Sequence, residues 1–268
     1  RIKLSQSETA TKKYIGDIEL FNSNGELIAE CLGLEGREAS AVDIEKSFPA
    51  NINSLLYEID WLSKDSLDEA ADTKPLNYLF LNNNNPLDLS LIHALKKAGN
   101  TVTTVSKGNN FRAVGDEVLE MNPHSKDDFA KLAAALKKVT KSFDGMIYSW
   151  GMNVDGSKPK DLYQGCEPLI YLLQEINHLQ TLSPQASLSI LTSRAQNSSL
   201  FNTEAIVDQL PLWGLGKTIS VEYPHLHTRL IDLDPSASDK ENCQFVINHL
   251  TLPSSTSYRL AIPASGSL

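Results

Sequence analysis

Gly216, Lys217 and Thr218 match the last three residues of a phosphate-binding loop. The full motif, G-x-x-x-x-G-K-S/T, needs another glycine five positions earlier, because that glycine lets backbone N–H groups face the phosphates. Pro211 stands at this position, and proline has a fixed φ and no N–H. The preceding stretch, "NTEAIVDQL", also lacks the pattern of a buried strand. These three residues therefore do not indicate a nucleotide site.

Two other groups of residues could do chemistry. His225 and His227, with Glu222 nearby, carry side chains that ligate metals. Asp232 and Asp234 could form an acid–base pair at the end of a predicted strand, although aspartates there more often form a turn. We favour a chain bend for the histidines and a turn for the aspartates, and the sequence contains no G-x-S-x-G or H-E-x-x-H motif.

A reductase would also need a proton donor. Ketone-reducing enzymes with a Rossmann-like fold use a tyrosine and a lysine one helical turn apart, since the ammonium lowers the pKa of the phenol. No tyrosine here is followed four residues later by lysine. Tyr78 is followed by Asn82, which matches a Y-x-x-x-N variant, but Tyr78 lies in a predicted strand, so the match is one of spacing only. We expect no catalytic residues.

Composition excludes several classes of partner. The formal net charge of −9 disfavours binding to nucleic acid or an anionic membrane, and no apolar run approaches the roughly 20 residues that span a bilayer. The three widely spaced cysteines predict a reducing compartment, the cytoplasm, and buried small side chains rather than a metal site: Cys31, Cys166 and Cys243. The chain starts without methionine, and we expect it to be part of a longer protein.

The first forty residues predict β-structure. Two runs, 14–21 and 26–34, flank Asn24-Gly25, which is a strong hairpin signal because glycine accepts a positive φ. A lone hairpin is marginal in water, so its sheet should continue outside the chain. Residues 40–53 are a predicted linker, and alternation in the stretch that follows predicts a short strand with one apolar face: Tyr57, Ile59 and Trp61.

The remainder alternates between strands and helices. Strands are predicted at 76–81, 101–106, 144–150, 186–193, 227–234 and 257–262. Helices are predicted at 87–99, 126–143, 165–180 and 240–250, the second capped by Ser125, with Phe143 on its apolar stripe and Lys137, Lys138 and Lys141 in its late turns. This order predicts an α/β fold, a Rossmann-like parallel sheet with flanking helices, preceded by the β-hairpin.

In such a sheet a dinucleotide lies at the carboxyl end of the first strand, on a G-x-G-x-x-G turn. This chain instead has four asparagines and then a proline: Asn82, Asn83, Asn84, Asn85 and Pro86. Asparagine tolerates a left-handed φ, but the side chains block close approach and the proline removes an N–H that phosphate would use. We therefore expect no bound cofactor at this degenerate loop.

One alternative stays open at this point. The second strand ends at Ser106-Lys107, with no acid for a ribose 2′-hydroxyl. Lys107 or Arg112 could instead contact a 2′-phosphate. A stand-alone NADP-dependent short-chain reductase with an aberrant cofactor loop is therefore the second hypothesis.

Several stretches resemble one family. "PLWGLGKTISVEYPHLHTRLIDLDP" resembles the signature of the structural subdomain of ketoreductase domains in modular polyketide synthases. "LYEIDW" resembles the entry strand of that subdomain, "GCEPLIYLLQEI" its central helix and "SLSILTSRAQ" the next strand, so the resemblance covers roughly 55–252. The early hairpin resembles the closing strands of a hot-dog dehydratase domain, and "YRLAIPASGSL" the start of an enoylreductase.

This resemblance implies a domain order and a role. It assigns 1–42 to the dehydratase tail, 43–70 to a linker and entry strand, 71–253 to the structural subdomain and 254–268 to the enoylreductase start. In the family this subdomain is a truncated Rossmann fold that binds no NADPH and braces a catalytic half encoded after the enoylreductase. NADPH and the catalytic residues would belong to that half, and the partners would be neighbouring domains of the same polypeptide.

The resemblance also suggests interface and packing residues. Tyr57 and Trp61 are the candidate contacts with the missing catalytic half. In the 211–224 stretch, proline would start a helix, tryptophan would fill a pocket and the glycines would allow close backbone approach: Pro211, Trp213, Gly214 and Gly216. Lys217 would then be a solvated side chain.

Overall fold

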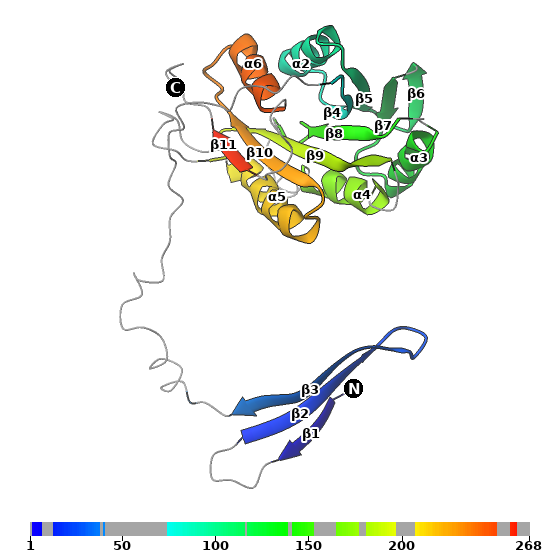
Figure 1. The fold of residues 1–268 in the computed structure, drawn as a ribbon, viewed down its shortest axis with the longest axis vertical. Coiled ribbons are helices and arrows are strands. Elements are labelled where there is room, and N and C mark those ends of the chain that lie inside the picture. Colours follow the sequence, from blue (N-terminus) through cyan, green and yellow to red (C-terminus); the bar gives the residue numbers. More distant parts are fainter. Residues whose placement is uncertain are drawn as a thin grey trace. The chain divides into compact units, whose positions relative to one another are not determined.

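The computed structural model describes residues 2–6, 13–37, 40, 74–115, 117–138, 141–152, 165–176, 181–196, 207–250 and 258–261. The chain divides into two compact units, Arg1–Asp60 and Trp61–Leu268, and each has its own β-sheet (Figure 1). The predicted short strand with Tyr57 and Trp61 lies outside the described residues. Among the described residues, no helix is long and apolar enough to cross a membrane.

The first unit contains a three-stranded antiparallel sheet of β1 (Ile2–Gln6), β2 (Lys13–Phe21) and β3 (Leu27–Arg37). The β2–β3 turn confirms the predicted hairpin. Gly25 has a φ of 82°, and the side-chain carbonyl of Asn22 accepts hydrogen bonds from the N–H groups of Asn24 and Glu26, both at 2.9 Å. The sequence did not predict β1, which pairs with β2 and adds a third strand to the predicted hairpin.

Large apolar side chains of this sheet remain exposed: Tyr14, Leu20, Phe21, Leu27, Ile28, Leu32 and Leu34. Cys31 is exposed as well, whereas Cys166 and Cys243 are buried. The prediction that all three cysteines are buried is therefore wrong for Cys31, because no described element covers its position on β3. A sheet with this much exposed apolar surface is typical of an interaction site.

The second unit contains an eight-stranded sheet in the order β11-β10-β9-β8-β4-β5-β7-β6. Every neighbouring pair is parallel except β6–β7, which confirms the predicted Rossmann-like sheet. In chain order the strands are β4 (Asn77–Asn82), β5 (Thr101–Lys107), β6 (Arg112–Gly115), β7 (Val118–Met121), β8 (Phe143–Tyr148), β9 (Leu182–Ser193), β10 (His227–Leu233) and β11 (Tyr258–Ala261).

Helices cover both faces of this sheet (Figure 1). One face carries α2 (Pro86–Lys97) and α6 (Asp239–Leu250). The other face carries α3 (Lys126–Leu136), α4 (Cys166–Ile176) and α5 (Leu210–Glu222). A 3-10 turn at Val207–Gln209 directly precedes α5. Alternate residues of β4 enter the two cores: Tyr78 and Phe80 pack with α2 and α6, whereas Leu79 and Leu81 pack with the other helices. Burial on both faces explains why the strand is a continuous apolar run.

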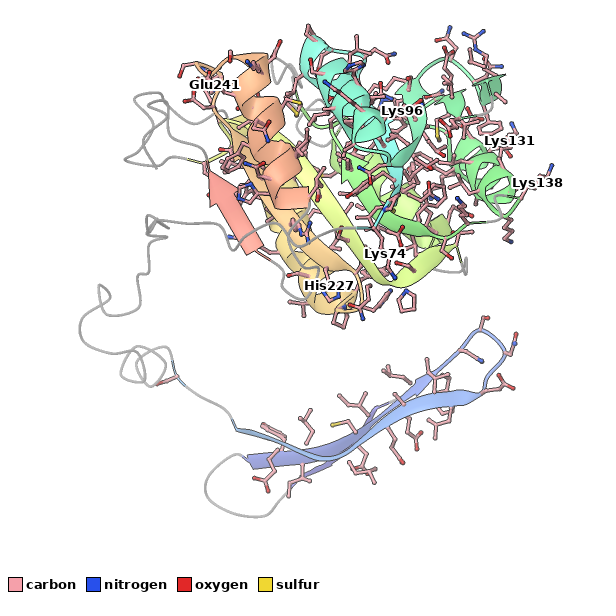
Figure 2. The ribbon with its side chains drawn as sticks, turned by 45° about the horizontal axis from the view of Figure 1, so that its top comes forward. Lys74, Lys96, Lys131, Lys138, His227 and Glu241 are labelled. Atoms are coloured by element: carbon pink, nitrogen blue, oxygen red, sulfur yellow. The ribbon has the colours of Figure 1, made fainter. Side chains whose placement is uncertain are left out.

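Helix α3 is shorter than predicted. The Ser125 hydroxyl caps it by accepting a hydrogen bond from the Asp128 N–H at 3.2 Å, as expected. The helix ends at Leu136, however, and Phe143 begins β8. The helical spacing of apolar residues continues in the sequence as far as Phe143, because the next strand also starts with a buried aromatic residue. The three lysines predicted for its late turns therefore lie beyond its end: Lys137, Lys138 and Lys141. Figure 2 shows this for Lys138.

Candidate functional site

The expected ligand crevice lies between β4 and β8. From β4 the chain continues to β5 on one side of the sheet, and from β8 it continues to β9 on the other. Ligands of open α/β sheets bind where the strand order reverses in this way, outside the carboxyl ends of the strands. The loops after β4 (83–85) and after β8 (149–152) are therefore the candidate site.

The asparagine turn after β4 makes its own hydrogen bonds. Asn84 has a left-handed φ of 58°, which asparagine tolerates, and its N–H donates to the Asn82 side chain at 3.0 Å. The Asn85 side chain caps α2 by accepting a hydrogen bond from the Asp88 N–H at 2.7 Å. Pro86 is the first residue of the helix. Side chains of the loop thus accept hydrogen bonds from two N–H groups near the helix start, those of Asn84 and Asp88, where a phosphate would otherwise bind.

Hydrogen bonds also join the two loops across the crevice. The Asn83 side chain donates to the Ser149 carbonyl at 2.5 Å. The Ser149 N–H continues the β4–β8 pairing by donating to the Leu81 carbonyl at 3.0 Å. The Trp150 indole N–H donates to the Asn82 carbonyl at 2.9 Å, and the Trp150 side chain is fully buried. These contacts connect the loops after β4 and β8 at the carboxyl ends of the two strands.

Asp88 adds a negative charge at this position. Its carboxylate accepts hydrogen bonds from the Asn83 N–H at 2.7 Å and the Ser149 hydroxyl at 2.8 Å, and it is fully buried. Burial raises the pKa of the Asp88 carboxyl above its ordinary value, against the effect of these hydrogen bonds. A carboxylate in the first turn of α2 interacts with the positive end of the helix dipole. The Asp88 carboxylate therefore lies at the helix start, where the dipole of α2 would otherwise favour a bound phosphate.

The two cations considered for a 2′-phosphate both have partners in the chain. The Lys107 ammonium donates to the Trp150 carbonyl at 2.9 Å, from the end of β5 to the loop after β8. The Arg112 guanidinium pairs with the Glu120 carboxylate on the neighbouring strand, with the Nε donating at 2.6 Å. The Lys107 ammonium is thus directed at a backbone carbonyl, and the Arg112 charge is paired with a carboxylate.

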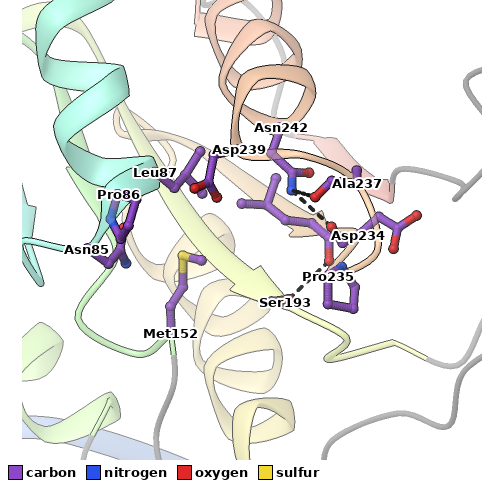
Figure 3. Close-up of a pocket in the computed structure, with 11 residues that line it drawn as sticks. Asn85, Pro86, Leu87, Met152, Ser193, Asp234, Pro235, Ala237, Asp239 and Asn242 are labelled. Carbon is purple, nitrogen blue, oxygen red and sulfur yellow. Dashed lines mark hydrogen bonds between the residues drawn. The ribbon is translucent and has the colours of Figure 1, made fainter.

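A cavity of about 220 Å³ lies on the same edge of the sheet, between the starts of α2 and α6 (Figure 3). Its wall is partly apolar, with Pro86, Leu87 and Met152. Asp234 and Asp239 contribute carboxylates, and no lysine, arginine or histidine is among the described residues that line it. This charge disfavours a nucleotide phosphate in the cavity as well.

The Gly216-Lys217-Thr218 stretch lies inside α5 and not in a loop before a helix. A Cβ built on Gly216 would come within 2.3 Å of a methyl carbon of Leu230, so the glycine allows α5 to approach β10 closely. At Gly214 no described atom lies within 4 Å of such a Cβ. The close approach to a neighbouring element that was expected at both glycines therefore occurs at Gly216, and among the described residues it does not occur at Gly214.

The other residues of this stretch lie at the start of α5. Pro211 is in its first turn, and Trp213 is buried in the core shared by α3, α4 and α5. The Trp213 indole N–H donates to the Thr192 hydroxyl at 2.9 Å. Trp213 thus connects α5 to the end of β9.

Asp232 continues this network into the turn after β9. Its carboxylate accepts hydrogen bonds from the Thr192 hydroxyl at 2.7 Å, the Ala195 N–H at 2.9 Å and the Gln196 N–H at 3.0 Å. These bonds hold the turn in which Arg194 has a left-handed φ of 59°. Burial raises the pKa of Asp232 above its ordinary value. Asp232 and Asp234 both support turns, since Asp234 accepts two hydrogen bonds from Ser236, each at 2.7 Å.

The remaining sequence candidates do not form a reactive cluster. No group of three or more histidine, cysteine, aspartate or glutamate side chains that could hold a metal occurs among the described residues, which include Glu222, His225 and His227. Tyr78 lies within β4, where a Cβ on Gly145 would come within 2.8 Å of its ring. Burial raises the pKa of Tyr78 to about 12, which is unsuited to proton donation near neutral pH.

Similar folds occur among solved structures. A structure with the adenylation, ketoreductase and pseudo-Asub domains of a keto acid-selecting NRPS module matches 76% of this chain, with a TM-score of 0.65 and 16% identity. An N-terminal ketoreductase from the macrolactin assembly line matches 75% with a TM-score of 0.56 and 13% identity. An alcohol dehydrogenase from Thermococcus sibiricus, complexed with 5-hydroxy-NADP, matches 72% with a TM-score of 0.54 and 11% identity.

The chain spans 17% of the first of these proteins, 41% of the second and 97% of the third. At such low identities the likeness concerns the fold, which is that of ketoreductase domains and short-chain dehydrogenases. A comparison with curated proteins found no match. A family model described as beta-ketoacyl synthase-like, N-terminal, matches residues 77–249, which include every described helix of the second unit except the last residue of α6. Since this match covers more than half of the sequence, the chain belongs to the beta-ketoacyl synthase-like, N-terminal family.

Proposed function

We propose that this chain is the non-catalytic structural subdomain of a ketoreductase within a multifunctional polyketide synthase. The observation that carries the proposal is the set of hydrogen bonds that spans the crevice between β4 and β8. Hydrogen bonds from Asn83 and Trp150 join its two loops, and the Asp88 carboxylate lies at the start of α2. A ketoreductase-like fold whose own side chains span the dinucleotide crevice would be suited to supporting another domain and not to reducing a ketone.

The subdomain would brace an NADPH-dependent catalytic half outside this sequence, with Tyr57 and Trp61 as contacts. NADPH and the catalytic residues would belong to that half. The proposed division of the chain is that suggested by the resemblance: dehydratase tail at 1–42, linker and entry strand at 43–70, structural subdomain at 71–253 and enoylreductase start at 254–268. The longer protein would act in the cytoplasm.

The first unit supports the dehydratase part of this proposal. Several apolar residues on β2 and β3 are more than half exposed, among them Ile28 at 64% and Leu32 at 66%. A three-stranded sheet with such a surface needs further elements to cover it in water. Those elements would be the preceding part of the dehydratase domain.

A stand-alone NADP-dependent reductase is the second candidate function. It is favoured by one observation, since the chain spans 97% of the Thermococcus sibiricus alcohol dehydrogenase. Against it, Lys107 donates to the Trp150 carbonyl, and Arg112 pairs with Glu120. A 2′-phosphate would have to compete with the Glu120 carboxylate for Arg112 and would share the Lys107 ammonium with the Trp150 carbonyl.

Calorimetric titration with NADPH distinguishes the two candidates. We expect no saturable heat from this chain up to millimolar NADPH, because the crevice is closed. Micromolar binding that is lost in Asn84→Ala or Lys107→Ala would contradict the structural-subdomain proposal and favour the reductase. A Lys138→Ala variant, changed beyond the end of α3, is the matched surface control.

A further inference from the structure

Three helices of the second unit begin with the same kind of cap. In each, a polar cap residue is followed three positions later by an acidic residue. The carboxylate of that acid accepts a hydrogen bond from a backbone N–H, either that of the cap residue itself or that of a residue two or three positions before the cap. The Asp88 carboxylate accepts a hydrogen bond from the Asn83 N–H at 2.7 Å. The Asp128 carboxylate accepts one from the Asn122 N–H at 3.0 Å, and the Glu241 carboxylate accepts one from the Ser238 N–H at 2.8 Å. This arrangement stabilises a helix start and by itself indicates no ligand.

Asp88 differs from the other two acids in its surroundings. Glu241 is exposed, and one Asp128 oxygen lies 3.5 Å from the Lys131 ammonium. Asp88 is fully buried, and its Oδ1 has no hydrogen-bond partner among the described residues. Its Oδ2 accepts a hydrogen bond from the Ser149 hydroxyl, which comes from the loop after β8 and not from its own helix. A buried carboxylate with an unpartnered oxygen is costly, so its position requires a compensating interaction.

The groups around Asp88 supply that interaction, and together they are the groups that bind an oxyanion. They comprise the Asn83 N–H, the Ser149 O–H and the start of α2 with its positive dipole end. The charge of Lys107, at the end of β5, also acts on the Asp88 carboxyl. These groups come from three strands and one helix that meet at the point where the strand order reverses.

We propose that the Asp88 carboxylate occupies an oxyanion site built by Asn83, Ser149 and the start of α2, and that this internal occupant excludes external carboxylate or phosphate groups. The inference rests on the proposed function, since it explains how a ketoreductase-like fold excludes a dinucleotide. It predicts a latent site: removal of the carboxylate should leave the donors in place for a small oxyanion from solution.

Asp88→Ala tests the latent site. The variant leaves the Asn83 N–H without its acceptor and leaves the Ser149 O–H with only the longer contact to the Leu81 carbonyl at 3.2 Å. We therefore expect it to unfold at a lower urea concentration than the wild type. Sodium formate or sodium phosphate should then stabilise it relative to sodium chloride of the same ionic strength. With a dissociation constant on the order of 10 mM, 50 mM of the anion raises the ratio of folded to unfolded protein about sixfold. The wild-type chain should show no such oxyanion-specific effect.

Two further variants make the result specific. Asp128→Ala removes the corresponding acid from α3, and its stability should not respond to formate or phosphate beyond the chloride control. If Asp88→Ala does not fold, Asp88→Ser takes its place, because serine is shorter than aspartate and is well tolerated at a helix start. Rescue by formate alone, or by formate and phosphate, supports the proposal and shows which oxyanion fits.

The proposal is overturned if neither anion exceeds chloride in the Asp88 variants, or if Asp128→Ala is rescued equally. Such a result would leave the proposed function intact, since that depends on NADPH binding by the wild-type chain. Conversely, NADPH binding by the wild type would contradict the proposed function whatever the behaviour of the Asp88 variants. The two failures are therefore distinguishable.

Discussion

Trp213→Ala is expected to lower the free energy of unfolding of the second unit by about 3–5 kcal/mol, which is the usual loss for a buried aromatic side chain. Trp213 is 2% exposed, and its indole N–H donates to the Thr192 hydroxyl at 2.9 Å. Thr192 donates in turn to Asp232, which holds the turn after β9. The substitution therefore removes core packing and loosens a hydrogen-bonded turn together.

Urea unfolding followed by circular dichroism measures this loss, and amide hydrogen exchange reports on the turn. Trp213→Phe is the matched control, because it keeps an aromatic ring in the core while the Thr192–Asp232 bond can persist. We expect it to lose about 1 kcal/mol, the contribution of one hydrogen bond. A loss below 1 kcal/mol for Trp213→Ala, with unchanged exchange at Ala195 and Gln196, would show that the residue does not support the turn.

Trp150→Ala is expected to have a similarly large effect, a loss of about 3–5 kcal/mol. Trp150 is fully buried, and its ring meets that of Phe129 edge-on, with centroids 6.4 Å apart. Its indole N–H also closes the crevice by donating to the Asn82 carbonyl. The substitution creates a cavity in the core and leaves that carbonyl without its donor.

The same unfolding measurement tests this second prediction, with Trp150→Phe as control. Phenylalanine keeps most of the ring contacts but cannot donate to Asn82, so the loss should be smaller than for alanine and greater than zero. Equal stability of the wild type and Trp150→Phe would mean that the indole hydrogen bond does not help to close the crevice. Equal stability of the wild type and Trp150→Ala would contradict the core packing described for Trp150.

Much of the fold could be predicted from the sequence, because strong local patterns coincide with buried elements. The apolar run of β4 is buried on both faces, and Ser125 caps α3 as its sequence pattern indicated. The short strands β6 and β7 were missed, because each has four residues and the side chains of β6 are all exposed. The end of α3 was mispredicted because Phe143, the first residue of β8, extends the helical apolar period.

The candidate site was predictable only in part. Absence of glycine from the 82–85 turn indicated that a dinucleotide would fit poorly, and that reasoning needs only local sequence. The closing contacts depend on residues far apart in the chain: the Ser149 hydroxyl and the Asp88 carboxylate are separated by 61 positions. No spacing rule relates a serine after one strand to an aspartate in an earlier helix, so this contact required the three-dimensional arrangement.

Amide hydrogen exchange at the crevice, measured with and without NADPH, tests the central claim most directly. The N–H of Asn83 donates to the Asp88 carboxylate and that of Ser149 to the Leu81 carbonyl, so both should exchange slowly. Their rates should remain the same at millimolar NADPH. Fast exchange at these amides, or protection that rises and saturates with NADPH, would show that the crevice opens and binds the cofactor, which would contradict the account.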